Sequence, residues 1–228
     1  FVTSSSRSLK GSIRVPGDKS ISHRSIMLGS LATGTTKVSG FLQGEDSLAT
    51  LNAFKEMGVA IERNGSDVTI HGVGMHGLKA PNNALNLGNS GTSMRLMSGL
   101  LSAQSFDSEL CGDESLSKRP MGRVIKPLRQ MGADISGPNS KPPLSIHGGK
   151  DLSAIEYTLP VASAQIKSCI LLAGLYSKGH TTVIENGISR DHTERMLKGF
   201  GYKVQTSQNK ISIEGGGSLQ ACNIEVPS

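Results

Sequence analysis

The stretch FKEMGVAIERNGSDVTIHG at residues 54–72 decides the fold, because its pattern returns twice further along the chain. The other copies are LRQMGADISGPNSKPPLSIHG at 128–148 and LKGFGYKVQTSQNKISIEG at 197–215. Each copy is an amphipathic run that reaches a glycine, then an apolar/polar alternation, a polar turn and a second alternation. This order predicts a helix, a C′ glycine and a β-hairpin in each copy.

The glycines that anchor the copies are Gly58, Gly132 and Gly201, which are almost evenly spaced. The unit between successive glycines is longer than the repeats of most solenoid proteins. Three such units predict one domain with pseudo-threefold symmetry.

The segment upstream of each copy follows a second shared pattern. GDKSISHRSIMLGSLATGTTKV (17–38), GNSGTSMRLMSGLLSAQSFDSEL (88–110) and VASAQIKSCILLAGLYSKGHTTVI (161–184) each begin with small polar residues, continue as an apolar run, break and resume. Each therefore predicts an N-capped helix followed by a strand.

Cations stand near the start of each of these predicted helices: Lys19 and Arg24, then Arg95, then Lys167. If the threefold packing directs the helix N-termini to one face, backbone N–H groups, hydroxyls and cations converge there. Such a face suits a small ligand with several negative charges. Ordinary caps and ordinary surface charge are the alternative for any one segment, but the agreement of three segments favours a binding face.

Composition narrows the function classes. The 228 residues, 36% of them hydrophobic, are enough for the core of one or two domains in a soluble protein. A net charge of +6 fits small anions or nucleic acid, but no run of Lys and Arg is longer than the pair Lys118-Arg119. With no Trp and 4% aromatic residues, platforms for base stacking are scarce, so no nucleic-acid partner is expected.

Three widely spaced cysteines, Cys111, Cys169 and Cys222, form no CxxC pair. They are expected to be reduced thiols of a cytoplasmic protein, with neither a disulfide framework nor a zinc site. The longest apolar run, 169–175, is too short for a membrane span, and residues 1–20 hold no signal-peptide pattern, so no membrane partner is expected.

Several residues carry weaker signals. His23 is interpreted as a structural imidazole rather than a general base. Asp191, His192 and Glu194 resemble metal ligands, but they are expected to open a helix, where acids favour the dipole. The stretch 16–20 lacks P-loop spacing, which argues against nucleotide hydrolysis.

Four motifs carry a family resemblance: VPGDKSISHRSIMLGSLATG (15–34), LGNSGTSMRLMSGLL (87–101), GDESLSKRPMGRVIKPLRQMGA (112–133) and SRDHTERMLKGFG (189–201). In this order and spacing the chain closely resembles the 5-enolpyruvylshikimate-3-phosphate synthase family, from the region of residue 10 to residue 228. The last motif is similar to the bacterial branch that differs from the enteric type.

The resemblance implies an α/β (α+β) fold: one pseudo-threefold half of the two-domain enolpyruvyl transferase fold, built from three βαβαββ units. The units are expected at 16–75, 85–149 and 156–216, inside a substrate-binding domain at 16–225. Residues 1–15 are expected to hold a strand of the other domain and the first crossing, and 226–228 the start of the return crossing. The chain begins with Phe1 rather than Met and ends on Val226-Pro227-Ser228 without a terminating element, so it is interpreted as a fragment. The resemblance implies that the C-terminal domain is the absent part.

The family reaction transfers the enolpyruvyl group of phosphoenolpyruvate to the 5-hydroxyl of shikimate 3-phosphate and releases phosphate. It implies no metal and no organic cofactor. Its acid/base carboxylates lie on the other domain of family members, so this chain alone is expected to anchor substrate without turning it over.

The resemblance also assigns site residues. Those matched to shikimate 3-phosphate are Lys19, Ser20, Arg24, Ser163, Gln165 and Arg190. Those matched to phosphoenolpyruvate are Lys19, Asn89, Gly91, Thr92, Arg119 and Gln165. Lys19 is also the residue expected to be catalytic. Two positions depart from many family members: Ala164 replaces a serine and Leu96 a proline.

Two alternative functions remain open. UDP-N-acetylglucosamine enolpyruvyl transferase shares the architecture, but it has a Lys-Asn pair where this chain has Lys19-Ser20, and a reactive cysteine in a mobile loop. Here Cys111 is predicted in a strand. The second alternative is a non-enzymatic module that binds RNA or phosphate on the helix-end face.

Overall fold

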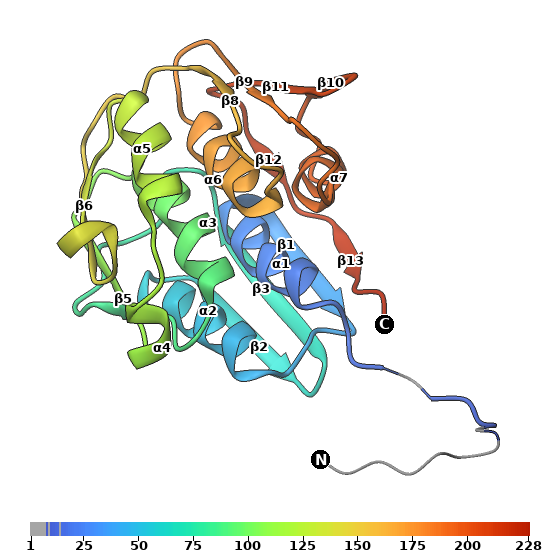
Figure 1. Ribbon diagram of the computed structural model, residues 1–228. Coiled ribbons are helices and arrows are strands. Elements are labelled where there is room, and N and C mark those ends of the chain that lie inside the picture. The colour runs from blue at the N-terminus through green and yellow to red at the C-terminus, as the bar shows by residue number, and fades with distance from the viewer. Residues whose placement is uncertain (1–7, 9, 14) are drawn as a thin grey trace.

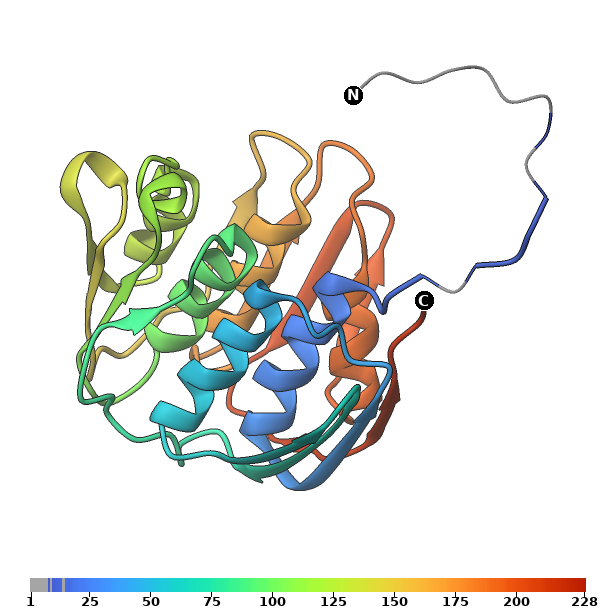
Figure 2. The same ribbon diagram turned by 90° about the horizontal axis from the view of Figure 1, so that it is seen from below.

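The computed structural model describes residues 8, 10–13 and 15–228. Within them, small mixed sheets lie around the outside and cover a central group of helices (Figures 1 and 2). The same arrangement of helices and strands occurs three times, which confirms the predicted pseudo-threefold α/β domain.

The elements follow in three units. The first unit comprises α1 (Lys19–Leu31), β1 (Ala32–Ser39), α2 (Glu45–Glu56), β2 (Ala60–Asn64) and β3 (Asp67–Val73). The second comprises β4 (Leu85–Asn86), α3 (Gly91–Leu101), β5 (Ser108–Cys111), α4 (Glu114–Ser117), α5 (Gly122–Gln130), β6 (Asp134–Ser136), the 3-10 turn η1 (Pro138–Ser140) and β7 (Leu144–His147). The third comprises β8 (Glu156–Thr158), α6 (Ala164–Gly174), β9 (His180–Ile184), α7 (His192–Gly199), β10 (Val204–Ser207) and β11 (Lys210–Glu214).

The sheets share one topology, and the first is completed from the far end of the chain. The second sheet has the order β4-β5-β7-β6 and the third β8-β9-β11-β10, each with one parallel pair and an antiparallel hairpin. In the first sheet the parallel neighbours of β1 are β12 (Leu219–Gln220) and β13 (Asn223–Glu225). The sequence patterns predict no strand at these positions. The structure therefore adds the two strands that complete the first sheet.

The three anchoring glycines stand where the pattern predicts them. Gly58, Gly132 and Gly201 follow α2, α5 and α7 with φ of 87°, 96° and 79°. L side chains rarely adopt this left-handed conformation, whereas glycine adopts it without a steric cost. Each glycine therefore ends its helix and turns the chain into its hairpin, as predicted.

The core lies where α1, α3 and α6 pack between the sheets. Most residues of these three helices are buried. A Cβ on Gly99 of α3 would lie 2.1 Å from the carbonyl oxygen of Cys169 on α6, so glycine lets the two helix backbones approach closely. Among the described residues, no helix has both the length and the apolar character of a membrane span.

The residues just before α1 meet the C-terminal residues of the chain beside the first sheet. The N–H of Asp18 donates to the carbonyl oxygen of Pro227 at 2.9 Å. A Cβ on Gly17 would lie 2.0 Å from the carbonyl oxygen of Gly40, so this meeting point is tightly packed. The strand expected within 1–15 falls partly on residues outside the described ones, and the described part of that segment forms neither helix nor strand.

Candidate anion-binding site

The central helices begin with matching caps. Asp18, Ser90 and Ser163 precede α1, α3 and α6, and the side-chain oxygen of each accepts from the backbone N–H three residues further on, at 2.7, 3.1 and 3.4 Å. These bonds satisfy some of the N–H groups that a helix leaves free at its start. The predicted N-capped helices are therefore confirmed in all three units.

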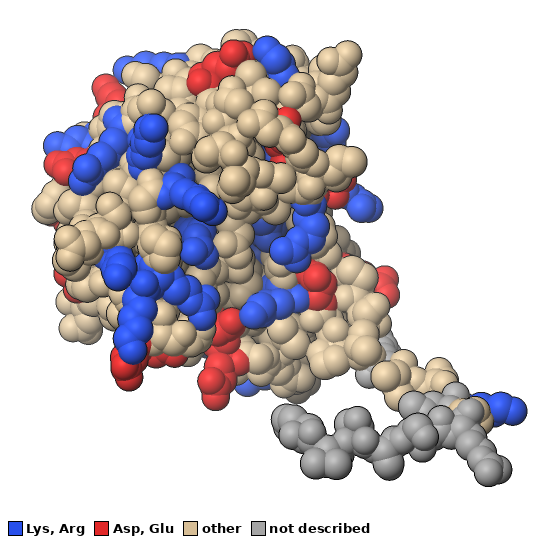
Figure 3. All heavy atoms as spheres, in the orientation of Figure 1, with Lys and Arg blue, Asp and Glu red and all other residues tan. Residues whose placement is uncertain are grey.

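Basic side chains gather over this part of the molecule. Figure 3 shows Lys and Arg spread over the face that Figure 1 presents, above the ends of α1, α3 and α6. The helix N-termini contribute partial positive charge to the same region. We call this face, which carries Lys19, Arg95, Arg119 and Arg190, the basic face. Its residues form two groups.

The first group connects the start of α3 to the start of α6. The Gln165 amide donates to Thr92 Oγ1 at 2.9 Å and accepts from Arg95 at 3.0 Å. Arg95 also donates to the carbonyl oxygen of Gly91 at 3.0 Å. Three residues matched to phosphoenolpyruvate, Thr92, Gly91 and Gln165, thus share one hydrogen-bonded chain.

Arg119 joins this group from the segment after α4. It donates to the Asn89 side chain, whose amide donates in turn to Asp113 at 2.7 Å. A Cβ on Gly91 would lie 2.7 Å from an Arg95 nitrogen and 3.0 Å from an Arg119 nitrogen. The bare Cα of Gly91 therefore lets two guanidinium groups lie beside one backbone position.

The electrostatics of the first group favour an anion. Burial lowers the pKa of Arg95, and the like charges of Arg119 and Arg123 lower it further. Arginines that lie close together repel one another, so a bound anion would relieve that repulsion. Planar guanidinium groups also match the geometry of carboxylate and phosphate.

The second group lies between α1, α6 and α7. Arg190 donates to Ser20 Oγ at 3.3 Å, and Arg24 donates to the carbonyl oxygen of Ser20 at 2.9 Å. Arg24 is 4% exposed and also donates to Ser168 and Thr193, each at 2.7 Å. Burial lowers the pKa of Arg24 to about 10, so it keeps its charge at neutral pH. Three residues matched to shikimate 3-phosphate are thus brought together.

Two other matched residues have local partners. Lys19 pairs with Asp46 of α2 at 3.0 Å and leaves 54% of its side chain exposed. Ser163 uses its hydroxyl oxygen as the cap of α6. Lys19 is therefore the most accessible of the matched cations on α1, while Arg24 is almost fully enclosed.

One predicted cation of the basic face is not available to a ligand. The Lys167 side chain is 1% exposed, and its ammonium lies 2.9 Å from a Glu185 oxygen and 2.6 Å from a Glu194 oxygen. The prediction that Lys167 joins the converging cations is therefore wrong. Lys167 turns into the protein because two carboxylates from later segments neutralise it there.

His23 is a structural imidazole, as the sequence favoured. It is fully buried, with Nδ1 2.8 Å from Thr50 Oγ1 and 3.1 Å from Ser93 Oγ. Burial lowers the pKa of His23 to about 4, so the ring is neutral at physiological pH. Glu194, weighed as a metal ligand, lies in the first turn of α7, as expected, and pairs with Lys167 of α6.

Ser168 and Thr193, which hold Arg24, were not singled out from the sequence. They lie 144 and 169 positions from Arg24 along the chain. Asp113, which holds Asn89, was missed as well, although it caps α4. Serine and threonine inside helices give no local signal for such a role, because their partners come from other units.

Known proteins resemble the whole described fold. The sequence model of the family described as EPSP synthase (3-phosphoshikimate 1-carboxyvinyltransferase) matches residues 3–228. The chain belongs to the EPSP synthase family. It is 66% identical, over its full length, to the 3-phosphoshikimate 1-carboxyvinyltransferase of Ruthia magnifica subsp. Calyptogena magnifica, and 63% identical over 227 residues to that of Hydrogenovibrio crunogenus.

Solved structures of EPSP synthase agree with the fold. The EPSP synthase of Acinetobacter baumannii superposes with a TM-score of 0.92 at 64% identity, over 96% of this chain and 50% of that one. The chain spans about half the length of the relatives it matches, 52% of the Ruthia magnifica protein. The resemblance drawn from the four motifs is therefore confirmed, for one half of an EPSP synthase.

Proposed function

We propose that this chain is the substrate-anchoring half of a 3-phosphoshikimate 1-carboxyvinyltransferase of the shikimate pathway. The observation that supports this most directly is the basic face, where Arg119, Arg95, Arg190 and Lys19 gather at three capped helix starts. Each proposed substrate carries a carboxylate and a phosphate, so their binding needs several cationic donors close together. The three free cysteines support a cytoplasmic location.

Shikimate 3-phosphate is assigned to the second group, around Ser20, Arg24 and Arg190, with Ser163 and Gln165 at the start of α6. Arg190 is exposed, so its guanidinium, which donates to Ser20 Oγ, is accessible to a phosphate. Gln165 is assigned to both substrates, and its hydrogen bonds to Thr92 and Arg95 belong to the first group.

Phosphoenolpyruvate is assigned to the first group, where Asn89, Gly91 and Thr92 precede or begin α3 and Arg119 faces them. Lys19, assigned to both substrates, supplies a mobile cation beside the reacting atoms once it leaves Asp46. In the reaction, the vinyl carbon is protonated to a methyl group, and the 5-hydroxyl loses its proton as its oxygen attacks to form a tetrahedral ketal. Phosphate then leaves as the methyl group gives up a proton, which restores the carbon–carbon double bond.

The acid/base groups of this reaction are assigned to the C-terminal half of the relatives, which this chain does not span. The chain alone should bind phosphoenolpyruvate poorly and release no phosphate from it, because a closed two-domain cleft is needed to present all donors at once. Adding a separately prepared C-terminal half should restore part of the activity. Phosphate release by this chain alone would contradict the assignment.

Calorimetry with shikimate 3-phosphate tests the anchoring role directly. Binding should be measurable, and Arg24→Ala should weaken it by about 2 kcal/mol through loss of a charge-assisted pair. Lys178→Ala, at an exposed ion pair with Asp151, is the control and should bind as the unchanged chain does. No heat and no chemical-shift change at millimolar ligand would refute the anchoring role.

Salt dependence separates this function from the RNA-binding alternative. Binding through a polynucleotide backbone falls steeply as salt is added, because many counterions are released. We expect the chain to prefer shikimate 3-phosphate to a polynucleotide at physiological salt. A tighter, strongly salt-dependent affinity for the polynucleotide would favour the alternative.

A further inference from the structure

The segment that carries Arg190 is held mainly by side chains. It runs from Glu185, at the end of β9, to Asp191, before α7. The Asn186 amide donates to the carbonyl oxygen of Leu159 at 2.8 Å, and the Ser189 hydroxyl donates to a Glu185 oxygen. Ile188, at the tip, is fully exposed. The orientation of Arg190 therefore depends on a few side-chain bonds rather than on a backbone ladder.

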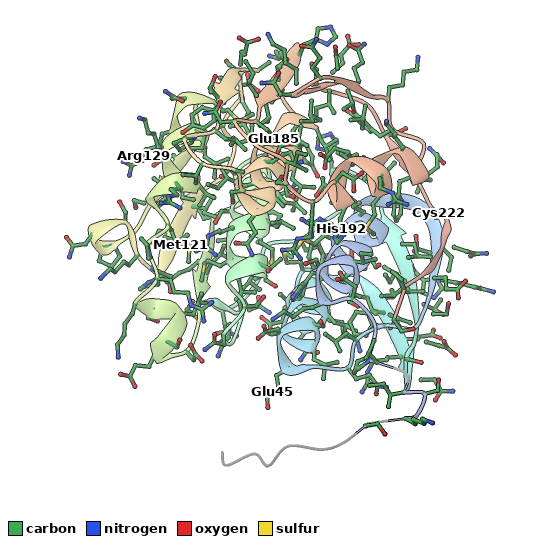
Figure 4. The ribbon with its side chains drawn as sticks, turned by 45° about the vertical axis from the view of Figure 1, so that its right-hand side comes forward. Glu45, Met121, Arg129, Glu185, His192 and Cys222 are labelled. Carbon is green, nitrogen blue, oxygen red and sulfur yellow. The ribbon has the colours of Figure 1, made fainter. Side chains whose placement is uncertain are left out.

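Glu185 connects this segment to the interior. One of its carboxylate oxygens accepts from Ser189, and the other lies 2.9 Å from the Lys167 ammonium. Figure 4 shows Glu185 next to α6, the helix that carries Lys167. Since Lys167 is 1% exposed and Glu185 10% exposed, water weakens this contact little.

The same ammonium also fixes the start of α7. Lys167 lies 2.6 Å from a Glu194 oxygen, and Thr193, the preceding residue, accepts from Arg24 at 2.7 Å. One buried cation on α6 is thus connected to the neighbours of both arginines of the second group. Figure 4 shows the start of α7, marked by His192, facing α1, on which Arg24 stands.

A buried cluster of charges is a costly way to stabilise a fold, and apolar residues of similar volume often do as well. Such clusters are better suited to hold a defined geometry, and the geometry held here is that of Arg190 and Arg24. We propose that Lys167 is a positioning residue for the phosphate of shikimate 3-phosphate: through Glu185 and Ser189 it holds Arg190 beside Ser20, and through Glu194 it holds Thr193 beside Arg24. This inference rests on the proposed function.

Ser189→Ala tests the last link without disturbing a buried charge. Loss of one hydrogen bond to a carboxylate should weaken shikimate 3-phosphate binding by about 3- to 10-fold. Binding of shikimate, which lacks the phosphate, should stay unchanged, and Ser189→Thr, which keeps the hydroxyl, should restore the affinity. Equal losses for both ligands, or no loss for either, would overturn the inference.

Lys167→Met tests the whole cluster, with Lys178→Met at an exposed ion pair as the matched control. Hydrogen exchange of the ligand-free chain should speed up by at least about tenfold at amides 186–191 in Lys167→Met, and less in Ser189→Ala. The control should leave these amides unchanged. Unchanged exchange in both test variants would overturn the positioning role.

Ligand binding and hydrogen exchange distinguish failure of the proposed function from failure of the positioning role of Lys167. If the unchanged chain binds neither shikimate 3-phosphate nor shikimate, the proposed function fails, whereas the exchange of amides 186–191 still decides whether Lys167 holds this segment. If Lys167→Met does not fold, Ser189→Ala and Ser189→Thr carry both tests.

Discussion

Arg95 on α3 and Lys167 on α6 stand at similar places, each within two turns of a capped helix start, yet their surroundings differ. Lys167 is enclosed with two carboxylates. Arg95 has neutral partners, Gly91 and Gln165, and cationic neighbours. The protein neutralises Lys167 with two carboxylates, whereas Arg95 is surrounded by neutral and cationic groups. Position on the helix therefore makes a cation possible at the site, but carboxylates from other segments decide whether a ligand can use it.

The largest expected effect concerns stability. Lys167→Met leaves two carboxylates buried without their cation, so it should lower the free energy of unfolding by about 3–5 kcal/mol. Arg95→Met loses neutral hydrogen bonds but relieves repulsion with Arg119, so its loss should stay below about 1.5 kcal/mol. Urea denaturation measures both. Equal losses would break the comparison between the two cations.

The stability of the protein should also depend on pH, because the neutral ring of His23 is buried at the boundary of α1, α2 and α3. In the unfolded chain this ring takes up a proton near the ordinary histidine pKa of 6.5, whereas burial delays protonation in the folded protein until about 4. Between these values the unfolded state binds more protons, so stability falls as pH drops from 6.5 to 4. The loss should be on the order of 3 kcal/mol.

Urea midpoints measured from about pH 7 to about pH 4 test this sign. His23→Gln, which cannot titrate, should show a flatter dependence on pH across this window, whatever its stability at neutral pH. An equally steep fall in the variant would assign the acid sensitivity to other groups.

The smallest expected effect lies in the first group. Gly91→Ala places a methyl group 2.7 Å from an Arg95 nitrogen and 3.0 Å from an Arg119 nitrogen, so both guanidinium groups must shift. In a full-length protein, phosphoenolpyruvate binding, followed by chemical shifts at millimolar ligand, should weaken by about 10-fold, equivalent to about 1.4 kcal/mol. Shikimate 3-phosphate binding should change little. Equal losses for both ligands would show that the two groups do not divide the substrates.

Local signals were sufficient for the central helices, the hairpins and the helix caps, but not for β12 and β13. The C′ glycines and the polar residues before α1, α3 and α6 act on their own turns of the chain, so the helices, hairpins and caps could be predicted from the sequence. The contacts between units could not be predicted from the sequence. Glu185 and Glu194 gave no sign that they enclose Lys167, and nothing near Arg24 indicated that Ser168 and Thr193 would hold it.

The pairing of β1 with β12 and β13 also affects the order in which the three units can become stable during synthesis. A ribosome makes residues 32–39 long before residues 219–225, so β1 must wait with one edge unpaired while the second and third units can already form their sheets. We therefore expect the unit that is made first to become stable last. In a chain truncated after residue 216, limited proteolysis should cut first between α1 and β3, while α3 and α6 stay protected. Equal protection of all three units would show that the late strands are not needed to finish the first sheet.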